Sequence, residues 1–581
     1  YGFTTPAGIV NLTMKRPTPS AYIAATLFGD AYGALGGDLD ASNTWGPVST
    51  RINALYGSVD SGINNARGHR SLFSAALDLK PIESVTVNLD GEYVLKQVNE
   101  PGVFDYKRLP TPTPGNLYPA LQLPPLLDPT VNFGPAWASN HAEERNLLSA
   151  VKWRISPAWD LSVSYGSSHL VRDRHFNTID LDTYGPNTNG SGLLSISLQP
   201  GATFDNSNYR ADLAGAEDLW FMKHEFLFGV SQNIRDSFNS TVVTATCPAA
   251  TPSGPGVTCV QNVFAPIAIP YTPFPAITGT RARINDIGYY LFDRIQMAPW
   301  LQLLAGARRT DYTETNLSGG AVKFKAEPTP FSYGAIVKPW SWMSIYASYV
   351  QGLETTPAAP ISAANAGATL PATQSTQQEA GIKLEALSGL LVQIAYFDIR
   401  RGSAYINGAN VYVLDGRAQY RGAEFSVTGE ATPNWSLYVT GQVLDATQIA
   451  GADTQITTNP TTGTVTVVPT VVGRQIENTP KYTFSFASEY RLPKFLPGFS
   501  LNGGVYFVGR RAVNQFNQAF IPGYTLFDLG AAYALKLYGK ETTIRLMGQD
   551  IGDKRYFSST GGNFVAQGPP RMVKFSLTTR L

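Results

Sequence analysis

The sequence predicts an all-β protein that crosses a membrane as one transmembrane antiparallel β-barrel. Charged residues make up only 15% of the 581 residues, whereas aromatic residues reach 12% and glycine occurs 54 times. The longest apolar runs fall far short of the roughly 20 residues that a membrane helix needs. Apolar and polar residues instead alternate over segments of about 8 to 12 residues. Because only helices and closed barrels satisfy their backbone inside a bilayer, this pattern favours a barrel.

Two soluble architectures, the β-sandwich and the β-propeller, also alternate apolar and polar residues along their strands. Soluble strands are usually about 5 or 6 residues long, and the alternating segments of this sequence are longer. A propeller repeats a signature about every 40 to 50 residues, and the sequence shows no such repeat. Linkers and composition shifts between the two halves are also missing, so one continuous barrel is expected.

The chain begins with a short candidate strand that looks like the end of a domain. Over residues 7–16, Ile9 to Met14 alternate between two faces, and Lys15 and Arg16 follow before a proline stop. This strand is apolar enough to need partners, yet ten residues cannot form a sheet alone. We therefore expect it beside or inside the barrel wall, and we expect the first barrel strand near Tyr22.

The next segments indicate which side chains meet lipid. Over residues 73–80 and 84–95, apolar side chains occupy one face of each predicted strand and polar side chains the other. The apolar face of a membrane strand meets lipid and the polar face lines the lumen. We expect Phe73, Leu77, Val87, Leu89 and Val163 to face lipid, and Asp78, Asn88, Asp90 and Glu92 to face the lumen.

Two kinds of connection distinguish the two ends of the predicted barrel. In the short kind, proline ends one strand and the next strand starts within a few residues, usually at tryptophan, as at residues 80–84, 156–160, 298–302, 338–342 and 432–436. Short turns with interfacial tryptophans are typical of the periplasmic end of a barrel. The long kind is rich in proline, glycine, asparagine and threonine and covers residues 99–144, roughly 173–212, 247–281, 353–376 and 446–480. These segments predict extracellular loops, where recognition would take place.

Both cysteines, Cys247 and Cys259, lie in one of the long loops. Two thiols in an exposed, proline-rich segment most simply form a disulfide bond, which fits an oxidising compartment. A metal site would need more ligands than this stretch offers, because the nearest histidine is His224. We therefore predict a disulfide bond between Cys247 and Cys259 and no metal site.

Three stretches of the chain point to one family. They are YGFTTPAGIVNLTMKRP at the start, SIYASYVQGLETTPAAP through GRAQYRGAEFSVTGEATPNWSL in the middle, and GQDIGDKRYFSS with GPPRMVKFSLTTRL at the end. They resemble, in that order, the plug-to-barrel segment, the barrel and the closing strands of TonB-dependent outer-membrane receptors of the siderophore-receptor branch. The resemblance implies about 22 strands, a plug end with its linker over residues 1–19, and a barrel over residues 20–581. It also implies that most of the plug domain is missing from the chain.

The resemblance implies a receptor and transporter for a ferric siderophore or a similar small chelate in the outer membrane of a Gram-negative bacterium. TonB would supply energy through a plug that this chain does not contain, and outer-membrane lipid and lipopolysaccharide would surround the barrel. The net charge of +1 gives no reason to expect nucleic acid as a partner. No enzyme motif or cofactor motif is present, so we predict binding and gating rather than catalysis. A second hypothesis is a plugless barrel that serves as a structural subunit or passive pore in a larger envelope complex.

The loop over residues 99–144 is the predicted ligand-binding segment because it combines nine prolines with several aromatic side chains. Aromatic faces stack on flat chelators, and an arginine can meet an anionic ferric complex. An alternative is that these side chains only pack a proline-stiffened loop. The predicted contacts are Phe104, Tyr106, Arg108, Tyr118, Phe133 and Trp137.

Overall fold

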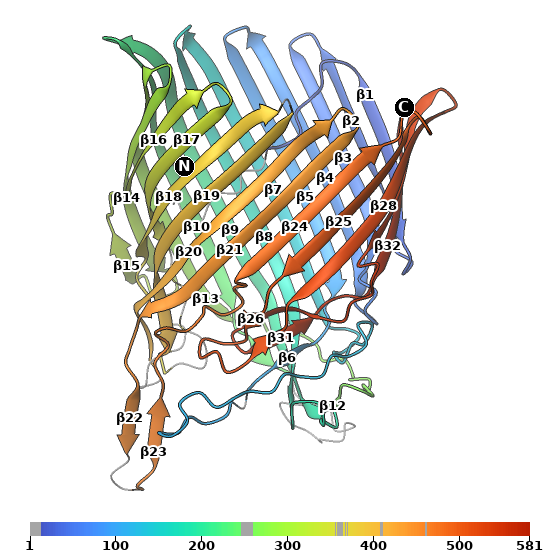
Figure 1. Ribbon diagram of the computed structural model, residues 1–581, viewed down its shortest axis with the longest axis vertical. Coiled ribbons are helices and arrows are strands. Elements are labelled where there is room, and N and C mark those ends of the chain that lie inside the picture. The colour runs from blue at the N-terminus through green and yellow to red at the C-terminus, as the bar shows by residue number, and fades with distance from the viewer. Residues whose placement is uncertain are drawn as a thin grey trace.

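A computed structural model describes residues 13–245 and 259–581, apart from residues 108, 355, 357–358, 360–363, 366–367, 369, 388, 407–410 and 459–461. In the described chain, 22 strands form one closed antiparallel barrel, which is the tilted wall in Figure 1. Each barrel strand pairs with the next barrel strand in the sequence, and the last strand pairs with the first to close the wall. The predicted all-β class and strand number are therefore confirmed.

The barrel strands are β1 (Tyr22–Asp30), β2 (Leu35–Trp45), β3 (Val48–Asp60), β4 (Arg67–Ile82), β5 (Val85–Asn99), β7 (Ser139–Ser156), β8 (Trp159–Leu181), β9 (Ser191–Leu219), β10 (Met222–Ser240), β13 (Gly279–Ala298), β14 (Leu301–Asn316), β16 (Phe331–Trp340), β17 (Met343–Glu354), β18 (Thr373–Leu387), β19 (Leu390–Ile406), β20 (Tyr412–Thr432), β21 (Trp435–Ala450), β24 (Tyr482–Arg491), β25 (Phe499–Val508), β28 (Tyr524–Leu537), β29 (Lys540–Gln549) and β32 (Met572–Arg580). The remaining strands lie in the long connections and are β6 (Val103–Asp105), β11 (Val243–Thr244), β12 (Cys259–Asn262), β15 (Val322–Ala326), β22 (Gln455–Thr458), β23 (Val465–Val468), β26 (Arg511–Ala512), β27 (Phe520–Ile521), β30 (Phe557–Gly561) and β31 (Phe564–Gln567).

One end of the barrel, the short-turn end, carries the predicted proline–tryptophan turns. All five of these segments connect neighbouring strands with two residues outside the strands, as at the turn between β7 and β8. Eight of the nine tryptophans lie in or beside the turns of this end: Trp45, Trp153, Trp159, Trp220, Trp300, Trp340, Trp342 and Trp435. Seven of these eight are exposed, which is the arrangement of an interfacial aromatic girdle.

The predicted faces of the strands are confirmed by the register. On β4 and β5, Asp78 pairs with Asn88, whereas Leu77 pairs with Leu89, so polar and apolar residues stay on opposite faces. Asp78 and Asp90 contact Arg16, which lies inside the barrel. On the opposite face Phe73, Leu89 and Val163 are exposed, as lipid-facing side chains should be. No helix in the described part of the chain is long and apolar enough to cross a membrane.

The expected loop over residues 173–212 is wrong. Strands β8 and β9 continue far beyond the rest of the wall, with 23 and 29 residues, and only residues 182–190 connect them. The extension has a physical cause, because residues 178–181 and 194–198 keep the period-two alternation that is typical of a strand. The outer part of β9 also pairs with β11 and β12, so its edge is covered.

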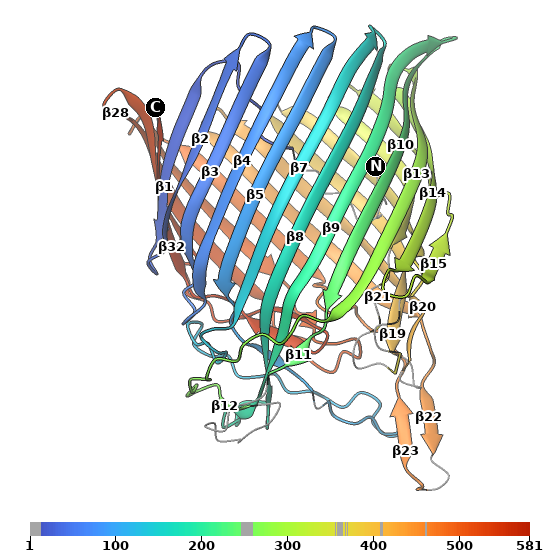
Figure 2. The same cartoon turned by 180° about the vertical axis from the view of Figure 1, so that it is seen from behind.

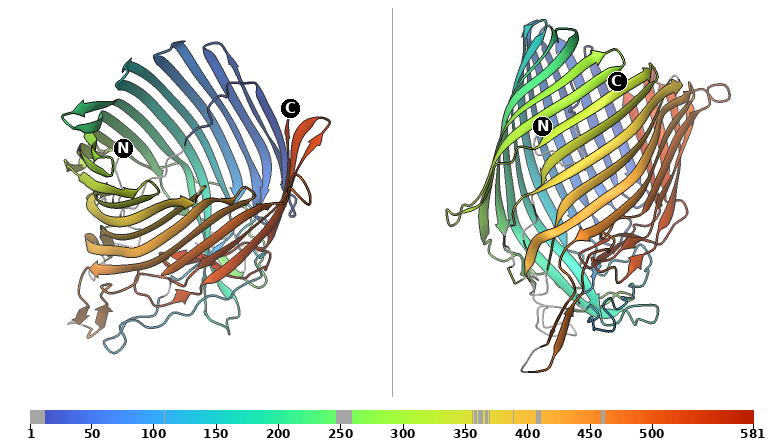
Figure 3. Two further views of the ribbon diagram at one scale, coloured as in Figure 1. Left: turned by 45° about the horizontal axis from the view of Figure 1, so that its top comes forward. Right: turned by 60° about the vertical axis from the view of Figure 1, so that its left-hand side comes forward.

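The long connections gather at the other end, the long-loop end. Figures 2 and 3 show them below the wall, with the β22–β23 hairpin projecting beyond the others. Most of the fully buried apolar side chains of the protein lie in these connections rather than in the barrel. These packed connections, together with the outer ends of β8 and β9, are called the loop cap. Its hydrophobic core, the core of the loop cap, consists of Phe104, Tyr106, Leu127, Phe133, Ile179, Leu181, Leu194, Ile196, Leu198, Ala245, Cys259, Val263, Ile269, Val513, Ala519, Ile521, Phe557 and Val565.

Candidate functional site

The segment before the first barrel strand is held to the inner wall near the short-turn end. Arg16 donates from Nη1 to both carboxylate oxygens of Asp90, at 2.5 and 2.7 Å, and it also pairs with Asp78. Lys15 Nζ lies 3.0 Å from Asp40 Oδ2, and Arg51 pairs with the same carboxylate. We call Lys15, Arg16 and these partners the N-terminal anchor. The predicted strand over residues 7–16 is tested only from Thr13 onward, where the chain is not in a strand.

The N-terminal anchor predicts unequal effects for its two cations. In Arg16→Ala, the carboxylate of Asp90, whose side chain is 4% exposed, loses its cation, and we expect a cost of about 1–3 kcal/mol. Lys15→Ala should cost much less, because Lys15 is mostly exposed and Asp40 keeps Arg51. The temperature at which the purified barrel loses its compact gel mobility measures this difference, and equal shifts for the two variants would contradict it.

At the long-loop end, the segment over residues 100–138 is the hub of the loop cap. It forms hydrogen bonds with six other connections, and the partners include Asn64, Gly185, Ile269, Thr470, Gln518 and Asn563. Strand β6 from this segment pairs with β8 on one side and β31 on the other, so a small sheet runs from β8 to the connection between β29 and β32. The loops are therefore folded against each other and are not independent.

Three of the six predicted ligand contacts lie in the core of the loop cap. Phe104 and Tyr106 are each 1% exposed and Phe133 is 3% exposed. The Phe104 and Phe133 rings are 5.2 Å apart, and Tyr106 Oη donates to the Gln122 carbonyl at 2.8 Å. Burial raises the pKa of Tyr106 well above its ordinary value. In this conformation no face of these rings is free, so they could reach a ligand only if the loop cap opened.

The other predicted contacts lie nearer the cap surface. Tyr118 is half-buried, its hydroxyl donates to the Thr470 carbonyl at 2.9 Å, and the Arg474 guanidinium lies 3.4 Å from its ring centroid. Trp137 Nε1 donates to the Ile269 carbonyl at 2.9 Å. Arg108 lies outside the described residues. Tyr118 and Trp137 thus join the hub to neighbouring loops, and a ligand role for them stays a prediction.

Two charged groups in the loop cap, the buried Arg511 and the half-buried Glu477, were not expected from the sequence. Arg511 on β26 donates to the carbonyls of Phe557 and Ser558, at 3.0 and 2.8 Å, and burial lowers its pKa. Burial raises the pKa of Glu477, whose carboxylate accepts one hydrogen bond from the Gly562 amide. Sequence reasoning missed these groups because their partners come from connections that are far apart in the chain.

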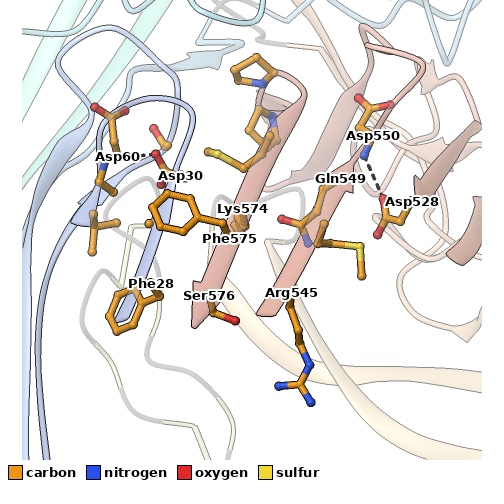
Figure 4. Close-up of a pocket in the computed structure, with 18 of the residues that line it drawn as sticks. Phe28, Asp30, Asp60, Asp528, Arg545, Gln549, Asp550, Lys574, Phe575 and Ser576 are labelled. Carbon is orange, nitrogen blue, oxygen red and sulfur yellow. Dashed lines mark hydrogen bonds between the residues drawn. The ribbon is translucent and has the colours of Figure 1, made fainter. Parts of the chain in front are cut away.

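A cavity of about 850 Å³ lies along the inner wall, between β1 and β3 on one side and β25, β28, β29 and β32 on the other. Figure 4 shows Asp30 and Asp60 at one side of it, Asp528 and Asp550 at the other, and Lys574 and Arg545 on the strands between them. Its volume suits a ligand of drug size. Among the described residues, no group of three or more histidine, cysteine, aspartate or glutamate side chains is placed to hold a metal ion.

The family motif near the end of the chain shapes this cavity. The Asp550 amide donates to Asp528 Oδ1 at 2.9 Å, and Asp550 and Asp553 both adopt positive φ angles in the turn that follows β29. The Tyr556 ring lies against Tyr524, with centroids 4.2 Å apart. Asp550, Asp553 and Tyr556 therefore have a structural role.

Cys259 is disulfide-bonded and only 3% exposed. Cys247 lies outside the described residues, so the pairing of the two cysteines stays a prediction. Cys259 is part of the core of the loop cap and is next to Leu194 on β9.

We expect His175 to make the loop cap sensitive to pH. It is 2% exposed, stacks on Phe274 with ring centroids 4.1 Å apart, and accepts a hydrogen bond from the Ser139 amide. Burial lowers its pKa, although Ser139 and Asp173 act in the opposite direction. The folded cap therefore favours the neutral ring, so its full stability is present above the unfolded pKa of about 6.5 and falls as the pH drops below that value.

We expect hydrogen exchange in residues 177–181 and 194–198, corrected for the intrinsic rate, to speed up between about pH 7.5 and pH 5. His175→Gln keeps an acceptor but does not titrate, so it should remove most of this change. A change of equal size in both proteins would assign the pH dependence to other groups.

The chain is similar to known proteins in both sequence and fold. The profile of the family described as TonB dependent receptor-like, beta-barrel, matches residues 88–549. The chain is 25% identical over 595 aligned residues to the ferrichrome receptor FcuA of Yersinia enterocolitica, covering 98% of this chain and 72% of that receptor. It is 24% identical to the ferric-pyoverdine 358 receptor of Pseudomonas putida over 53% of this chain and 37% of that receptor.

Solved structures share the fold. The ferric preacinetobactin receptor BauA of Acinetobacter baumannii superposes with a TM-score of 0.80 at 20% identity, covering 98% of this chain and 81% of that one. The receptor FpvA of Pseudomonas aeruginosa, bound to a heterologous pyoverdine, gives a TM-score of 0.79 at 18% identity, over 98% of this chain and 72% of that one. These identities show the architecture alone.

Proposed function

Because the chain belongs to the family of TonB-dependent receptor-like β-barrels of Gram-negative outer membranes, we propose that it binds a ferric siderophore at its long-loop end and transports it with energy from TonB. The long-loop end is then extracellular and the short-turn end periplasmic. The observation that carries the proposal is the match to the ferrichrome receptor over 98% of this chain, which includes the loops as well as the strands.

The geometry supports binding in two places. The wall cavity offers carboxylates, three cationic side chains (Arg70, Arg545 and Lys574) and aromatic rings within one space, which suits a polar chelate with an aromatic or aliphatic body. The loop cap covers this end with packed loops, so ligand entry and cap opening would be coupled. Tyr118 and Trp137 are the predicted aromatic contacts that remain nearest the surface.

The N-terminal anchor would hold the chain to the barrel wall while TonB supplies energy for transport. A segment that enters the lumen before Thr18 would be tied to the wall at Asp40, Asp78 and Asp90. We propose that a plug domain coupled to TonB joins the barrel here. Force applied to the plug would then act on a fixed point, and the barrel would stay in place.

Titration of the purified protein with a panel of ferric chelates tests the proposal. Ferrichrome, a ferric pyoverdine and ferric preacinetobactin are suitable probes, and quenching of intrinsic tryptophan fluorescence is the readout. We expect saturable binding of at least one ferric chelate and much weaker binding of its iron-free form. Absence of saturable binding across the panel, or equal binding with and without iron, would contradict a ferric siderophore as the ligand.

A further inference from the structure

A polar patch lies on the outer face of the barrel, where lipid would contact it. Asp90, Leu148, Gly166, Asn208, Asn233 and Asp286 face the lumen together, because each is the cross-strand partner of the next. Side chains alternate along a strand, so residues at odd separations from these positions face outward. The lipid-face patch, defined this way, consists of Trp159, Glu217, His224, Phe226, Phe228 and Asp293.

The charged members of the lipid-face patch are held by local contacts. His224 Nδ1 lies 2.8 Å from Asp293 Oδ2, and the second carboxylate oxygen of Asp293 has no hydrogen-bond partner. Trp159 Nε1 donates to Glu217 Oε1 at 2.5 Å, and Glu217 is the direct cross-strand neighbour of His224. Neither Glu217 nor Asp293 has a lysine or arginine ion pair among the described residues.

Aromatic rings complete the lipid-face patch. The Trp159 ring is nearly parallel to those of Phe226 and Phe228, with centroid distances of 6.5 and 6.4 Å, and His224 stacks on Phe226 at 5.3 Å. Trp159 lies over Gly215, where any side chain would clash with the indole. Unlike the other tryptophans of the girdle, Trp159 is therefore only half-exposed and presents a fixed ring.

The position of the lipid-face patch in the membrane follows from the girdle. His224 is four residues from Trp220, which is 92% exposed in the turn between β9 and β10. The patch is therefore at the depth of the headgroups of the periplasmic leaflet. Ionisable side chains on a lipid-facing surface are costly unless something pairs with them.

We propose that the lipid-face patch binds the primary ammonium headgroup of a phospholipid in the periplasmic leaflet. Its two carboxylates and one histidine carry a net negative charge at neutral pH, so the complementary headgroup is cationic at this point. An ammonium group can donate hydrogen bonds to Glu217 and Asp293 and lie against aromatic faces at the same time. A headgroup that carries only hydroxyl and phosphate can donate hydroxyl hydrogen bonds, but it has no positive charge to pair with the carboxylates or to lie against the rings.

Native mass spectrometry of the purified full chain tests the proposal. The protein in detergent is mixed with dioleoyl phospholipids that differ only in the headgroup: ethanolamine, N-acetylethanolamine or glycerol. We expect the amount of ethanolamine lipid bound to the protein to exceed that of either other lipid by about fivefold or more. Because the N-acetyl lipid keeps the phosphate and loses the positive charge, it isolates the ammonium.

Variants connect the preference to the lipid-face patch. The double variant Glu217→Gln, Asp293→Asn should retain the three lipids equally, while Asp218→Asn, whose side chain is on the lumen face of the same strand, should keep the preference. Compact mobility on unheated gels shows that each variant is folded. Retention of all three lipids to the same extent by the unmodified protein, a preference for the glycerol lipid, or an unchanged preference in the double variant would each overturn the proposal. None of these outcomes depends on siderophore binding.

Discussion

Replacing Phe104 with alanine should open the loop cap and leave the barrel intact. Phe104 is 1% exposed and packs on Phe133 in the core of the loop cap. Removal of a phenylalanine from a packed core costs about 3–5 kcal/mol, which is a large share of the stability that a group of loops can have. Apart from the outer ends of β8 and β9, the strands of the barrel are outside this core, so the pairing of their membrane parts should not change.

Hydrogen exchange provides the measurement. In Phe104→Ala, residues 177–181 and 194–198 should lose protection, whereas the membrane parts of β4 and β5 should keep it. Phe264→Ala is the matched control, because Phe264 is in the same end of the protein but is 55% exposed. Protection of the cap strands that survives in Phe104→Ala would show that the loops do not share one core.

Replacing Leu89 with arginine should prevent stable assembly of the barrel, whereas Asn88→Arg should be tolerated. Leu89 is 41% exposed on the lipid face, and Asn88 faces the lumen beside Asp78. An arginine on the lipid face costs about 2–4 kcal/mol near the middle of the bilayer, whereas an arginine in the lumen stays in water. The two substitutions are one residue apart and introduce the same side chain, so they differ only in the face they occupy.

Folding into lipid vesicles, followed by the gel mobility of unheated samples, measures this difference. Leu89→Arg should give little compact protein, and Asn88→Arg should fold nearly as well as the unmodified chain. If the two variants fold to the same extent, the assignment of faces on β5 is wrong.

The barrel could be predicted from the sequence because its determinants are local. Period-two alternation sets which face of β4 and β5 meets lipid, and proline followed by tryptophan marks the short turns. The prediction from composition was wrong for residues 173–212, where abundant glycine and asparagine were interpreted as a loop. Alternation in residues 178–181 and 194–198 was the correct indication, and β6, β11 and β12 cover edges that the sequence alone could not show to be covered.

The loop cap could not be predicted, because its contacts join residues far apart in the chain. Phe104 on β6 is the cross-strand partner of Val565 on β31, and no sequence pattern indicates that pairing. The aromatic residues of the hub were recognised as important, but the structure places three of them in the core of the loop cap. The N-terminal anchor was predicted only in part. The sequence singled out Lys15 and Arg16 and placed Asp90 on the lumen face, but it did not indicate that Arg16 contacts Asp90.

The most direct test of TonB-dependent siderophore transport is the uptake of radioactive iron from a ferric siderophore by cells that express this protein as their only receptor for that chelate. We expect saturable uptake that disappears when TonB is deleted and that falls strongly in Phe104→Ala, with no increase in the entry of large antibiotics. Uptake that does not saturate and persists without TonB, together with increased antibiotic entry, would show a passive pore and contradict the account.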